Sequence, residues 1–474
     1  MWKIRPDNLK RVSHTHSDQS FALVVVSNRL PVVSRKGPNG ETVSTLSPGG
    51  LVAAVAPALA GKKAAWVGWS GSDDSHAPPL VVEGITVFPV PLSTELADAH
   101  YEGYSNSTLW PLFHHVGVPH QVHQGWFDAY SSVNQRFAEH VAALVAPGGV
   151  VWVHDYQVML LPQMMKSLRP DVTVGYFHHI PFPPLEILSD LPEAQQIVEG
   201  LASADLVGFQ RESDSENFRA ALKNYARETA SHNPRVGTYP ISIDFDAVAE
   251  QAGRPGAHQR AVELRESWGN PRKVLLGVDR IDYTKGIPER LEAFEQLLDS
   301  GQVSASDVVF VQAGSPSREN VSSYQELRER IDSIVARINH NHTQLSGGGV
   351  VRYIAENLPR DEMLALFVAA DVMVVSALRD GMNLVAKEFI ACTRDNSGVL
   401  VLSTETGAAD QMPDAVLADP RDPAALARAL LQALTMDSIE IGSRMAALRG
   451  FGAKHDVSRW SADFLADLAS SATA

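Results

Sequence analysis

Short runs of valine, isoleucine and leucine alternate along the chain with longer segments in which apolar residues recur every three or four positions. A nearly continuous apolar run is typical of a strand buried on both faces of a parallel sheet, and the longer period is typical of a helix packed on that sheet. The strand-like runs cover 21–28, 149–155, 172–180 and 205–210, then 273–279, 307–314, 349–356, 371–378 and 398–404. The pattern therefore predicts an α/β protein with two doubly wound, Rossmann-like domains.

Several helices between these runs are marked by one apolar face. The two clearest faces consist of Ile287, Leu291, Phe294 and Leu298, and of Tyr324, Leu327, Ile331, Ile334 and Ile338. A further helix is predicted to begin at Pro423 with Asp422 as its N-cap, because an acceptor side chain before a first-turn proline is a common helix start.

The length of 474 residues exceeds what one ordinary hydrophobic core covers, so we expect two domains. The apolar pattern breaks near Pro240, and a polar stretch then continues to Pro271. We expect a flexible arm at 1–20, a first domain at 21–243, a second at 244–455, and a C-terminal helix at 456–474 that packs back on the first domain. Ligands of open α/β sheets bind beyond the carboxyl ends of the strands, which predicts a cleft lined by strand-end loops of two facing domains.

The charge balance limits the partners. The formal net charge is −15, from 40 Lys and Arg against 55 Asp and Glu. Such a field repels nucleic acid and anionic membranes, so neither is an expected partner, and a phosphate-bearing substrate needs a local cationic pocket. No run approaches the roughly 20 apolar residues that span a bilayer, and residues 1–20 lack the apolar stretch of a secretory signal.

The cysteine content fits a cytoplasmic protein. With Cys392 as the sole cysteine, no intrachain disulfide can form, and we interpret its thiol as a packing group. Two nucleotide motifs are absent: no GxGxxG follows a strand, and there is no GxxxxGK[ST]. A dehydrogenase or a P-loop kinase is therefore disfavoured.

Charged residues stand where several apolar runs end. They are Arg29, His154, Asp155, His179, Arg280, Lys285, Arg379 and Asp380. A buried idle charge is costly, so each residue is either part of a structural ion pair or loop cap, or a functional group. Their occurrence at strand ends in both halves favours function.

Two segments have the character of phosphate sites. In VDRIDYTKG, Arg280 and Lys285 flank a loop that leads into the predicted helix 287–298, and two cations beside a helix N-terminus form a receptor for a diphosphate. In SPGGL, Gly49 and Gly50 precede a predicted helix, so their backbone amides can approach a phosphate, although a plain turn is the alternative.

The segment ALRDGMNLVAKEF places Asp380 at a strand-to-helix turn and Glu388 about two helical turns later. A carboxylate in this position can bind sugar hydroxyls. The alternative is that Asp380 caps the helix while Lys387 and Glu388 face solvent.

A metal site competes with this interpretation in the first half. His178 and His179 lie close to His154 and Asp155 in the expected sheet order, although no HxxxH or HxH spacing supports metal binding.

Taken together, the motifs resemble a known family. The matching segments are VVVSNRLPV, SPGGL, WVGWSG, SNSTLWPLFH, VWVHDYQ, FHHIPFP, LVGFQ, DRIDYTKGIPERL, SPSR and LRDGMNLVAKEF, which run from about residue 21 to past 407. In this order they resemble the trehalose-6-phosphate synthases, retaining glycosyltransferases of GT-B architecture, in which two Rossmann-like domains face a central cleft.

The resemblance implies a role for each matching residue. Arg280 and Lys285 would hold the donor diphosphate and Glu388 the nucleotide ribose, while His179 and Asp380 orient the donor glucose. The donor-contacting turn would comprise Gly381, Met382, Asn383, Leu384 and Val385, with Gly50 in a loop that closes over the site. The acceptor residues would be Asp155, which binds hydroxyls, and Arg29, Tyr101, Trp110 and Arg318, which surround the phosphate.

The implied reaction moves glucose from a nucleotide-glucose to glucose 6-phosphate with retention and needs no metal and no cofactor. UDP-glucose is the family's usual donor, and ADP-glucose is the alternative. We favour attack from the leaving-group face, with double displacement through Asp380 as the other route. Another GT-B transferase or phosphorylase, or a catalytically silent sugar-phosphate sensor, competes with this assignment. Enzyme size and apolar helices favour a homo-oligomer, a dimer or tetramer.

Overall fold

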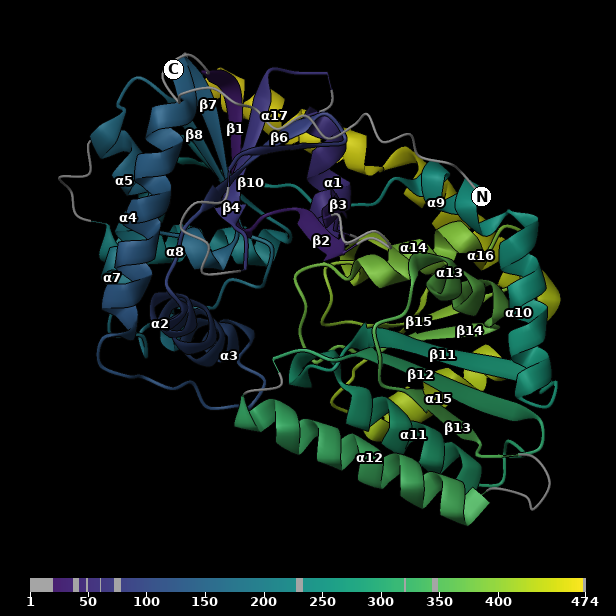
Figure 1. The fold of residues 1–474 in the computed structure, drawn as a ribbon. Coiled ribbons are helices and arrows are strands. Elements are labelled where there is room, and N and C mark those ends of the chain that lie inside the picture. Colours follow the sequence, from purple (N-terminus) through teal and green to yellow (C-terminus); the bar gives the residue numbers. More distant parts are fainter. Residues whose placement is uncertain are drawn as a thin grey trace. The chain divides into compact units, whose positions relative to one another are not determined.

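The structure, a computed structural model of the chain, describes residues 20–36, 42–47, 50–59, 61–71, 78–226, 233–318, 321–342 and 348–471. Residues 1–19 of the expected arm and Gly49 lie outside these ranges. The chain forms two compact units, Met1–Pro240 with Ser458–Ala474, and Ile241–Val457 (Figure 1). Each unit is described below by itself.

The first unit contains an eight-stranded sheet in which the neighbouring strands are parallel except β5, which is antiparallel to β6. The order across the sheet is β10 (Arg235–Thr238), β9 (Leu206–Phe209), β8 (Thr173–Phe177), β7 (Val145–His154), β1 (Phe21–Arg29), β4 (Ala64–Trp69), β6 (Ile85–Val90) and β5 (Leu80–Val82). A separate antiparallel pair joins β2 (Val32–Lys36) and β3 (Thr42–Leu46).

Helices of the first unit connect and cover these strands (Figure 1). They are α1 (Gly50–Leu59), α2 (Thr94–Ala97), α3 (Trp110–His114), α4 (Trp126–Leu144), α5 (Leu161–Leu168), α6 (Leu185–Leu188), α7 (Ala194–Ala202) and α8 (Glu212–Tyr225), with a π-helix at Asp98–Leu109 and a 3₁₀ turn at Tyr156–Val158.

The last helix, α17 (Val457–Ser471), packs on strands of the first unit. Its Phe464 ring stacks on Trp152 of β7 with ring centres 5.2 Å apart. Gly175 of β8 and Gly208 of β9 lie under this helix, where a Cβ atom would come within 2.7 Å of Leu468 and Phe464 respectively. Glycine therefore permits the close approach of α17 to the sheet.

The second unit contains a six-stranded, wholly parallel sheet. Its order is β13 (Val351–Ile354), β12 (Val308–Ser315), β11 (Lys273–Arg280), β14 (Val372–Val375), β15 (Val399–Ser403) and β16 (Val416–Ala418). Its helices are α9 (Phe245–Ala252), α10 (Pro255–Ser267), α11 (Ile287–Asp299), α12 (Ser322–His342), α13 (Arg360–Ala369), α14 (Leu384–Cys392), α15 (Pro423–Thr435) and α16 (Ser438–Lys454), with 3₁₀ turns at Tyr283–Lys285 and Ala409–Gln411. The predicted α/β class with two parallel-sheet domains is confirmed.

The apolar faces predicted for α11 and α12 are buried. All nine side chains predicted to form them are buried. Asp422 accepts hydrogen bonds from the amides of Ala424 and Ala425, at 2.9 and 3.1 Å, so the predicted N-cap of α15 is confirmed. The Cys392 side chain is also buried, as expected of a packing group.

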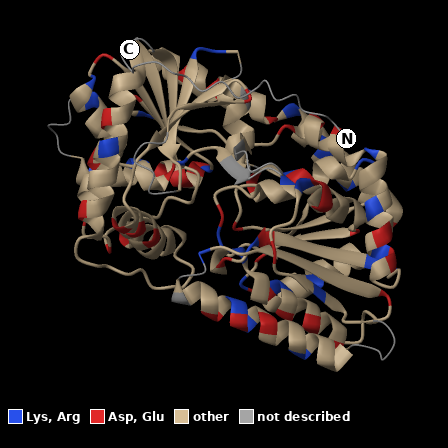
Figure 2. Cartoon of the chain, in the orientation of Figure 1, with Lys and Arg blue, Asp and Glu red and all other residues tan. Residues whose placement is uncertain are grey.

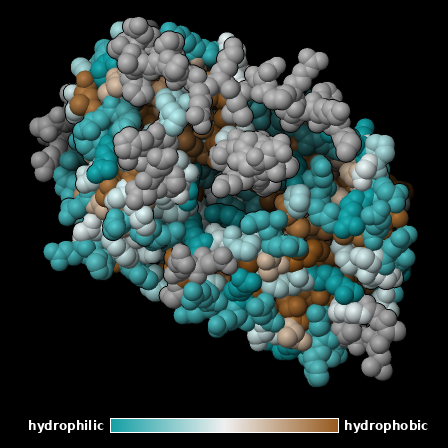
Figure 3. All heavy atoms as spheres, viewed as in Figure 1, coloured by the Kyte–Doolittle hydropathy of each residue, from teal (hydrophilic) through white to brown (hydrophobic). Residues whose placement is uncertain are grey.

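Charges of both signs cover the outer helices (Figure 2). On α12, Arg330 and Arg337 pair with Glu292 and Glu295 of α11 at 3.0 and 2.6 Å. The face drawn in Figure 3 mixes hydrophilic and hydrophobic residues. Within the described residues, no helix is both long and apolar enough to cross a membrane.

Candidate functional site

In the first unit, polar residues gather at the carboxyl edge of the sheet. β1 ends at Arg29, β7 ends at His154, and His179 comes two residues after β8. The parallel register pairs Ser27 with His154, and His154 with Phe177. Because parallel strands end at the same edge, this edge is where an open α/β sheet presents its ligand-binding side chains.

Asp155 and two histidines form the centre of this edge. The Nδ1 atom of His154 lies 3.1 Å from Nε2 of His179, and the Asp155 carboxylate accepts a hydrogen bond from the His179 amide at 3.2 Å. Asp155 has φ +78°, a strained backbone for a residue other than glycine, and such strain is common at functional sites. Burial holds the pKa of His154 well below its usual value and lowers the pKa of His179 to about 3. Both imidazoles are therefore neutral near pH 7.

The competing interpretation, a metal site, lacks a cluster of possible ligands in the part of the chain that the structure describes. Within the described residues there is no group of three or more His, Cys, Asp or Glu side chains that could hold a metal ion. His178, the third histidine of the motif, is buried and bonds through Nδ1 to the Tyr176 hydroxyl at 2.9 Å.

Arg29 is exposed and held by aromatic rings. Its guanidinium carbon lies 4.2 Å from the centre of the Trp69 ring and 5.8 Å from that of Tyr101. A side chain at Gly71, which has φ +86°, would collide with the Arg29 guanidinium. Stacking thus fixes a cation whose polar edge stays available for an anion.

Trp110 begins α3 and is buried. Its ring packs on His114, with centres 4.1 Å apart, and on Tyr156, at 5.7 Å. Tyr156 directly follows Asp155, so Trp110 packs against the turn that carries Asp155. Tyr101 lies beside Arg29. Gly50, by contrast, is the first residue of α1 and is exposed.

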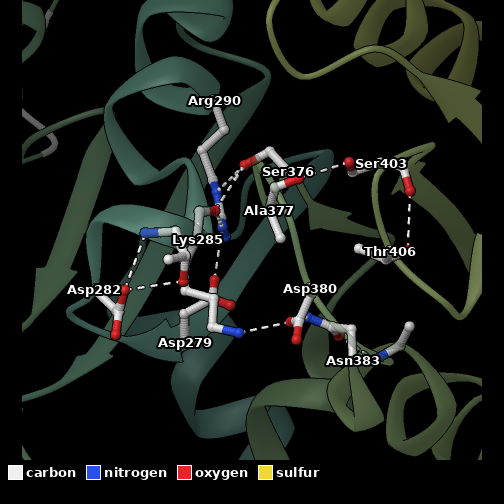
Figure 4. A network of polar contacts seen from close by, with 12 residues as sticks. Asp279, Asp282, Lys285, Arg290, Ser376, Ala377, Asp380, Asn383, Ser403 and Thr406 are labelled. Atoms are coloured by element: carbon white, nitrogen blue, oxygen red, sulfur yellow. Dashed lines mark hydrogen bonds and ion pairs between the residues drawn. The ribbon is translucent and has the colours of Figure 1, made fainter. Parts of the chain in front are cut away.

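In the second unit, Lys285 and Asp380 meet although 95 positions separate them. The Lys285 ammonium lies 2.6 Å from Asp380 Oδ2, as Figure 4 shows. Asn383 donates a second hydrogen bond to the same oxygen at 3.3 Å. The Asp380 amide bonds to the carbonyl of Glu405 at 3.1 Å, which anchors the loop from behind.

The start of α14 differs from the helix-cap alternative. Asn383, with φ +87°, is the N-cap of the helix in place of Asp380, and it accepts from the Ala386 amide at 3.1 Å. Leu384 and Val385 are the first two residues of α14, where the backbone amides of a helix start stabilise an anion.

Lys387 and Glu388 also differ from the alternative in which both face solvent. Lys387 is buried and donates to the Ile241 carbonyl at 2.7 Å and to Gln411 Oε1 at 2.8 Å. Burial lowers the pKa of Lys387 to about 7. Glu388 is half-buried and accepts from Arg360 at 2.6 Å.

The charges of Arg280 and Arg318 both act on the Asp282 carboxylate. The Arg318 side chain is buried and lies 3.2 Å from Asp282 Oδ2, with the Tyr324 hydroxyl as a further partner. Burial raises the pKa of Asp282, but the charges of Arg318, Arg280 and Lys285 outweigh it and lower that pKa to about 2. The exposed Arg280 therefore lies near Lys285, as a two-cation diphosphate receptor requires.

Sequence reasoning missed Arg290 and Ser376, which lie beside Lys285 (Figure 4). A signal for Arg290 exists, because it stands three positions after Ile287 and so falls on the apolar face of the predicted helix. No comparable pattern marks Ser376.

Comparisons with known proteins cover almost the whole chain. The model of glycosyltransferase family 20 matches residues 22–470. The trehalose-6-phosphate synthase of Mycobacterium sp. (strain KMS) is 47% identical over 463 residues, 94% of each chain. That of Mycolicibacterium smegmatis is 45% identical over 463 residues, 94% of this chain and 92% of the relative.

Comparisons with solved structures also cover almost the whole chain. The α,α-trehalose-phosphate synthase (UDP-forming) of Burkholderia xenovorans in complex with glucose 6-phosphate is 32% identical with a TM-score of 0.86, covering 94% of this chain and 99% of its own. An E. coli structure bound with UDP-2-fluoro glucose is 33% identical with a TM-score of 0.86, covering 94% and 98%.

Proposed function

The chain belongs to glycosyltransferase family 20 and is a glycosyltransferase, and on that premise we propose that it makes α,α-trehalose 6-phosphate from a nucleotide-glucose and glucose 6-phosphate. The observation that carries the proposal is the pair of polar strand-end sites, one in each unit, on a chain that matches trehalose-6-phosphate synthases over 94% of its length. One relative binds a UDP-glucose analogue and another binds glucose 6-phosphate.

The donor binds to the second unit in this proposal. Arg280 and Lys285 hold the diphosphate, so the Lys285 ammonium exchanges its bond to Asp380 for one to a phosphate oxygen. Asp380 is then free to accept bonds from glucose hydroxyls. The amides from Gly381 to Val385 supply neutral donors at the helix start. Glu388, oriented by Arg360, accepts from the ribose hydroxyls.

Most of the proposed acceptor residues belong to the first unit. Asp155 accepts from the acceptor's hydroxyls, and Arg29, stacked on Trp69 and flanked by Tyr101, pairs with its phosphate. Because arginine matches phosphate oxygens with a fork of donors, this arrangement selects a phosphorylated sugar. The neutral His179 contributes a hydrogen bond to the donor glucose. Trp110 of the first unit and Arg318 of the second complete the proposed acceptor set, and Gly50 belongs to the proposed donor set.

The transfer itself breaks the bond between glucose C1 and the diphosphate oxygen and forms a bond from C1 to the acceptor oxygen. The departing diphosphate oxygen takes the acceptor proton, so no protein base is needed and the new bond forms on the face that the leaving group occupied. In this complex Asp380 accepts from Asn383 and from glucose hydroxyls, which makes it a poor nucleophile and favours this route over double displacement.

Product analysis tests the function and separates its rivals. Purified enzyme is offered UDP-glucose with glucose 6-phosphate, fructose 6-phosphate or inorganic phosphate, and each product is identified by mass and chromatography. Only glucose 6-phosphate should give a disaccharide phosphate. A panel of UDP-, ADP- and GDP-glucose then settles the donor base, which a ribose-binding Glu388 does not select. A homo-oligomer and a cytoplasmic location stay predictions.

Turnover is expected to survive exhaustive chelation. Two cationic side chains, Arg280 and Lys285, meet the charge of the diphosphate, so a divalent ion has no part in the proposed chemistry. The rate of nucleoside diphosphate release is measured before and after treatment with excess chelator. Loss of turnover that returns with magnesium or manganese would contradict the roles given to these two residues.

Arg318→Ala is expected to raise the acceptor KM by one to two orders of magnitude and to leave the donor KM nearly unchanged. A charge-assisted contact to phosphate contributes roughly 1.5 to 3 kcal/mol, which sets this range. Steady-state kinetics with each substrate varied in turn gives both constants. Tyr324→Phe removes a hydroxyl from the same cluster without removing charge, and it should leave the acceptor KM within about twofold. If Arg318→Ala raises the KM of both substrates equally, Arg318 instead supports the loop that carries Asp282.

A further inference from the structure

Arg290 is a buried charge whose hydrogen bonds run to the segments that carry the donor site. It lies in the first turns of α11 with no exposed surface, and its guanidinium pairs with Asp279 of β11 at 2.6 Å. Nη2 donates to the Lys285 carbonyl at 2.7 Å, and Nη1 donates to the Val374 carbonyl at 3.1 Å. Nε donates to Ser376 Oγ at 2.7 Å. One side chain thus joins the Lys285 turn to the end of β14.

Ser376 completes this connection. Its hydroxyl accepts from Arg290 and donates to the Gly286 carbonyl at 2.7 Å. Gly286 has φ +60°, and a side chain there would collide with the Ser376 carbonyl. The turn that contains Lys285 and Gly286 therefore lies in close contact with the end of β14. Two successive carbonyls, those of Lys285 and Gly286, therefore accept hydrogen bonds from Arg290 and Ser376 respectively.

Stability alone is a weak reason for such an arrangement. Taking a guanidinium and a carboxylate out of water costs several kcal/mol per ion, and well-packed apolar side chains often replace a buried ion pair without loss. A network of directed bonds does what apolar packing cannot, because it fixes backbone position. Fixed position matters in a transferase, where a misplacement of about 1 Å can cost a hundredfold in rate.

We propose that Arg290 and Ser376 form a buried clamp that holds the backbone of Lys285 so that its ammonium reaches the donor diphosphate. Both are positioning residues, since they act through Lys285. The inference rests on the proposed function, because it requires Lys285 to bind the donor. The same bonds set the distance between the Lys285 turn and the loop that carries Asp380, since β14 leads into that loop.

Ser376→Ala is the variant that tests the clamp, because it removes one hydroxyl and leaves the ion pair of Arg290 in place. We expect its kcat with UDP-glucose to fall by about tenfold, since the Lys285 turn loses one of its two anchors. The matched control is Ser403→Ala. Ser403 is also buried, is the last residue of the neighbouring strand β15 and donates to the Ala377 carbonyl at 2.7 Å, but it bonds to neither Lys285 nor Gly286. Ser403→Ala should keep kcat within about twofold at a similar loss of thermal stability.

A double-mutant cycle with Lys285→Ala separates positioning from a general structural effect. If Ser376 acts through Lys285, then Ser376→Ala lowers kcat about tenfold in the native background and less than about twofold in the Lys285→Ala background. An equal loss in both backgrounds, no loss in the native background, or a matching loss in Ser403→Ala would overturn the clamp.

Two further results keep the test decisive. If Lys285→Ala alone turns over normally, Lys285 does not bind the donor as proposed. The clamp proposal then fails together with that role. If Ser376→Ala does not fold, Ser376→Cys takes its place in the cycle, because a thiol fills nearly the same volume and is only a weak hydrogen-bond donor. The same two-background comparison then decides.

Discussion

Arg280→Ala or Lys285→Ala is expected to lower kcat by about a hundredfold to a thousandfold. Negative charge grows on the diphosphate as the glycosidic bond breaks, and preorganised cations stabilise that growth selectively, as an oxyanion hole does. Part of their attraction acts equally on bound substrate, so the donor KM should rise as well. Steady-state kinetics on folded, purified variants gives both effects.

The double variant and a control sharpen this expectation. Removing both cations should cost less than the product of the two single losses, because they act on one group. Arg330→Ala removes an exposed arginine that pairs with Glu292 at 3.0 Å, and it should leave kcat unchanged. Near-normal kcat in folded Arg280→Ala enzyme would show that Arg280 takes part in a surface ion pair and not in catalysis.

Arg290→Met is expected to lower the free energy of unfolding by about 3 to 5 kcal/mol, because it leaves the Asp279 carboxylate buried without its counter-charge. For a protein unit of this size that corresponds to a fall in Tm of about 10 °C. Chemical or thermal denaturation followed by circular dichroism measures the loss. Arg337→Met, which removes an exposed partner of Glu295, should change stability by less than about 1 kcal/mol.

The pH dependence of the unfolding free energy lost in Arg290→Met identifies the cause of the loss. Burial already raises the pKa of Asp279, and without Arg290 that pKa rises further. A carboxyl group whose pKa is higher in the folded state than in the unfolded state binds its proton more tightly when folded, so lowering the pH favours the folded state. The loss of unfolding free energy in Arg290→Met should therefore become smaller as pH falls from 7 toward the pKa of Asp279 in the unfolded chain. A loss that is constant with pH would point to lost packing instead.

The strands that sequence patterns could reveal were those with long apolar runs. Nine predicted strands are present. Eight of them lie inside a sheet, where burial on both faces enforces such runs, and β13 is the edge strand of the second sheet. β4 (Ala64–Trp69) was missed because alanine and glycine weaken its pattern, and β6 (Ile85–Val90) because Pro89 interrupts it. β16, with three residues, is too short to show any period.

The site residues were visible in the sequence, but their partners were not. Strand-end position marked Lys285 and Asp380 as candidates, yet their ion pair depends on β11 and β14 being neighbours, which no local pattern encodes. The helix-cap alternative for Asp380 was wrong because local spacing cannot say that Asn383, in a left-handed conformation, takes the cap. Lys387 illustrates the same limit, since its hydrogen-bond partners Ile241 and Gln411 come from distant segments.

The most direct test of the central claim is the structure of the product formed from UDP-[1-¹³C]glucose and glucose 6-phosphate. Nuclear magnetic resonance of the purified product reports the configuration at both anomeric carbons and the position of the phosphate. We expect one disaccharide in which the labelled carbon keeps its α configuration and is joined α,α to glucose that carries phosphate on C6. Labelled free glucose, a β linkage or a product lacking the phosphate would contradict it.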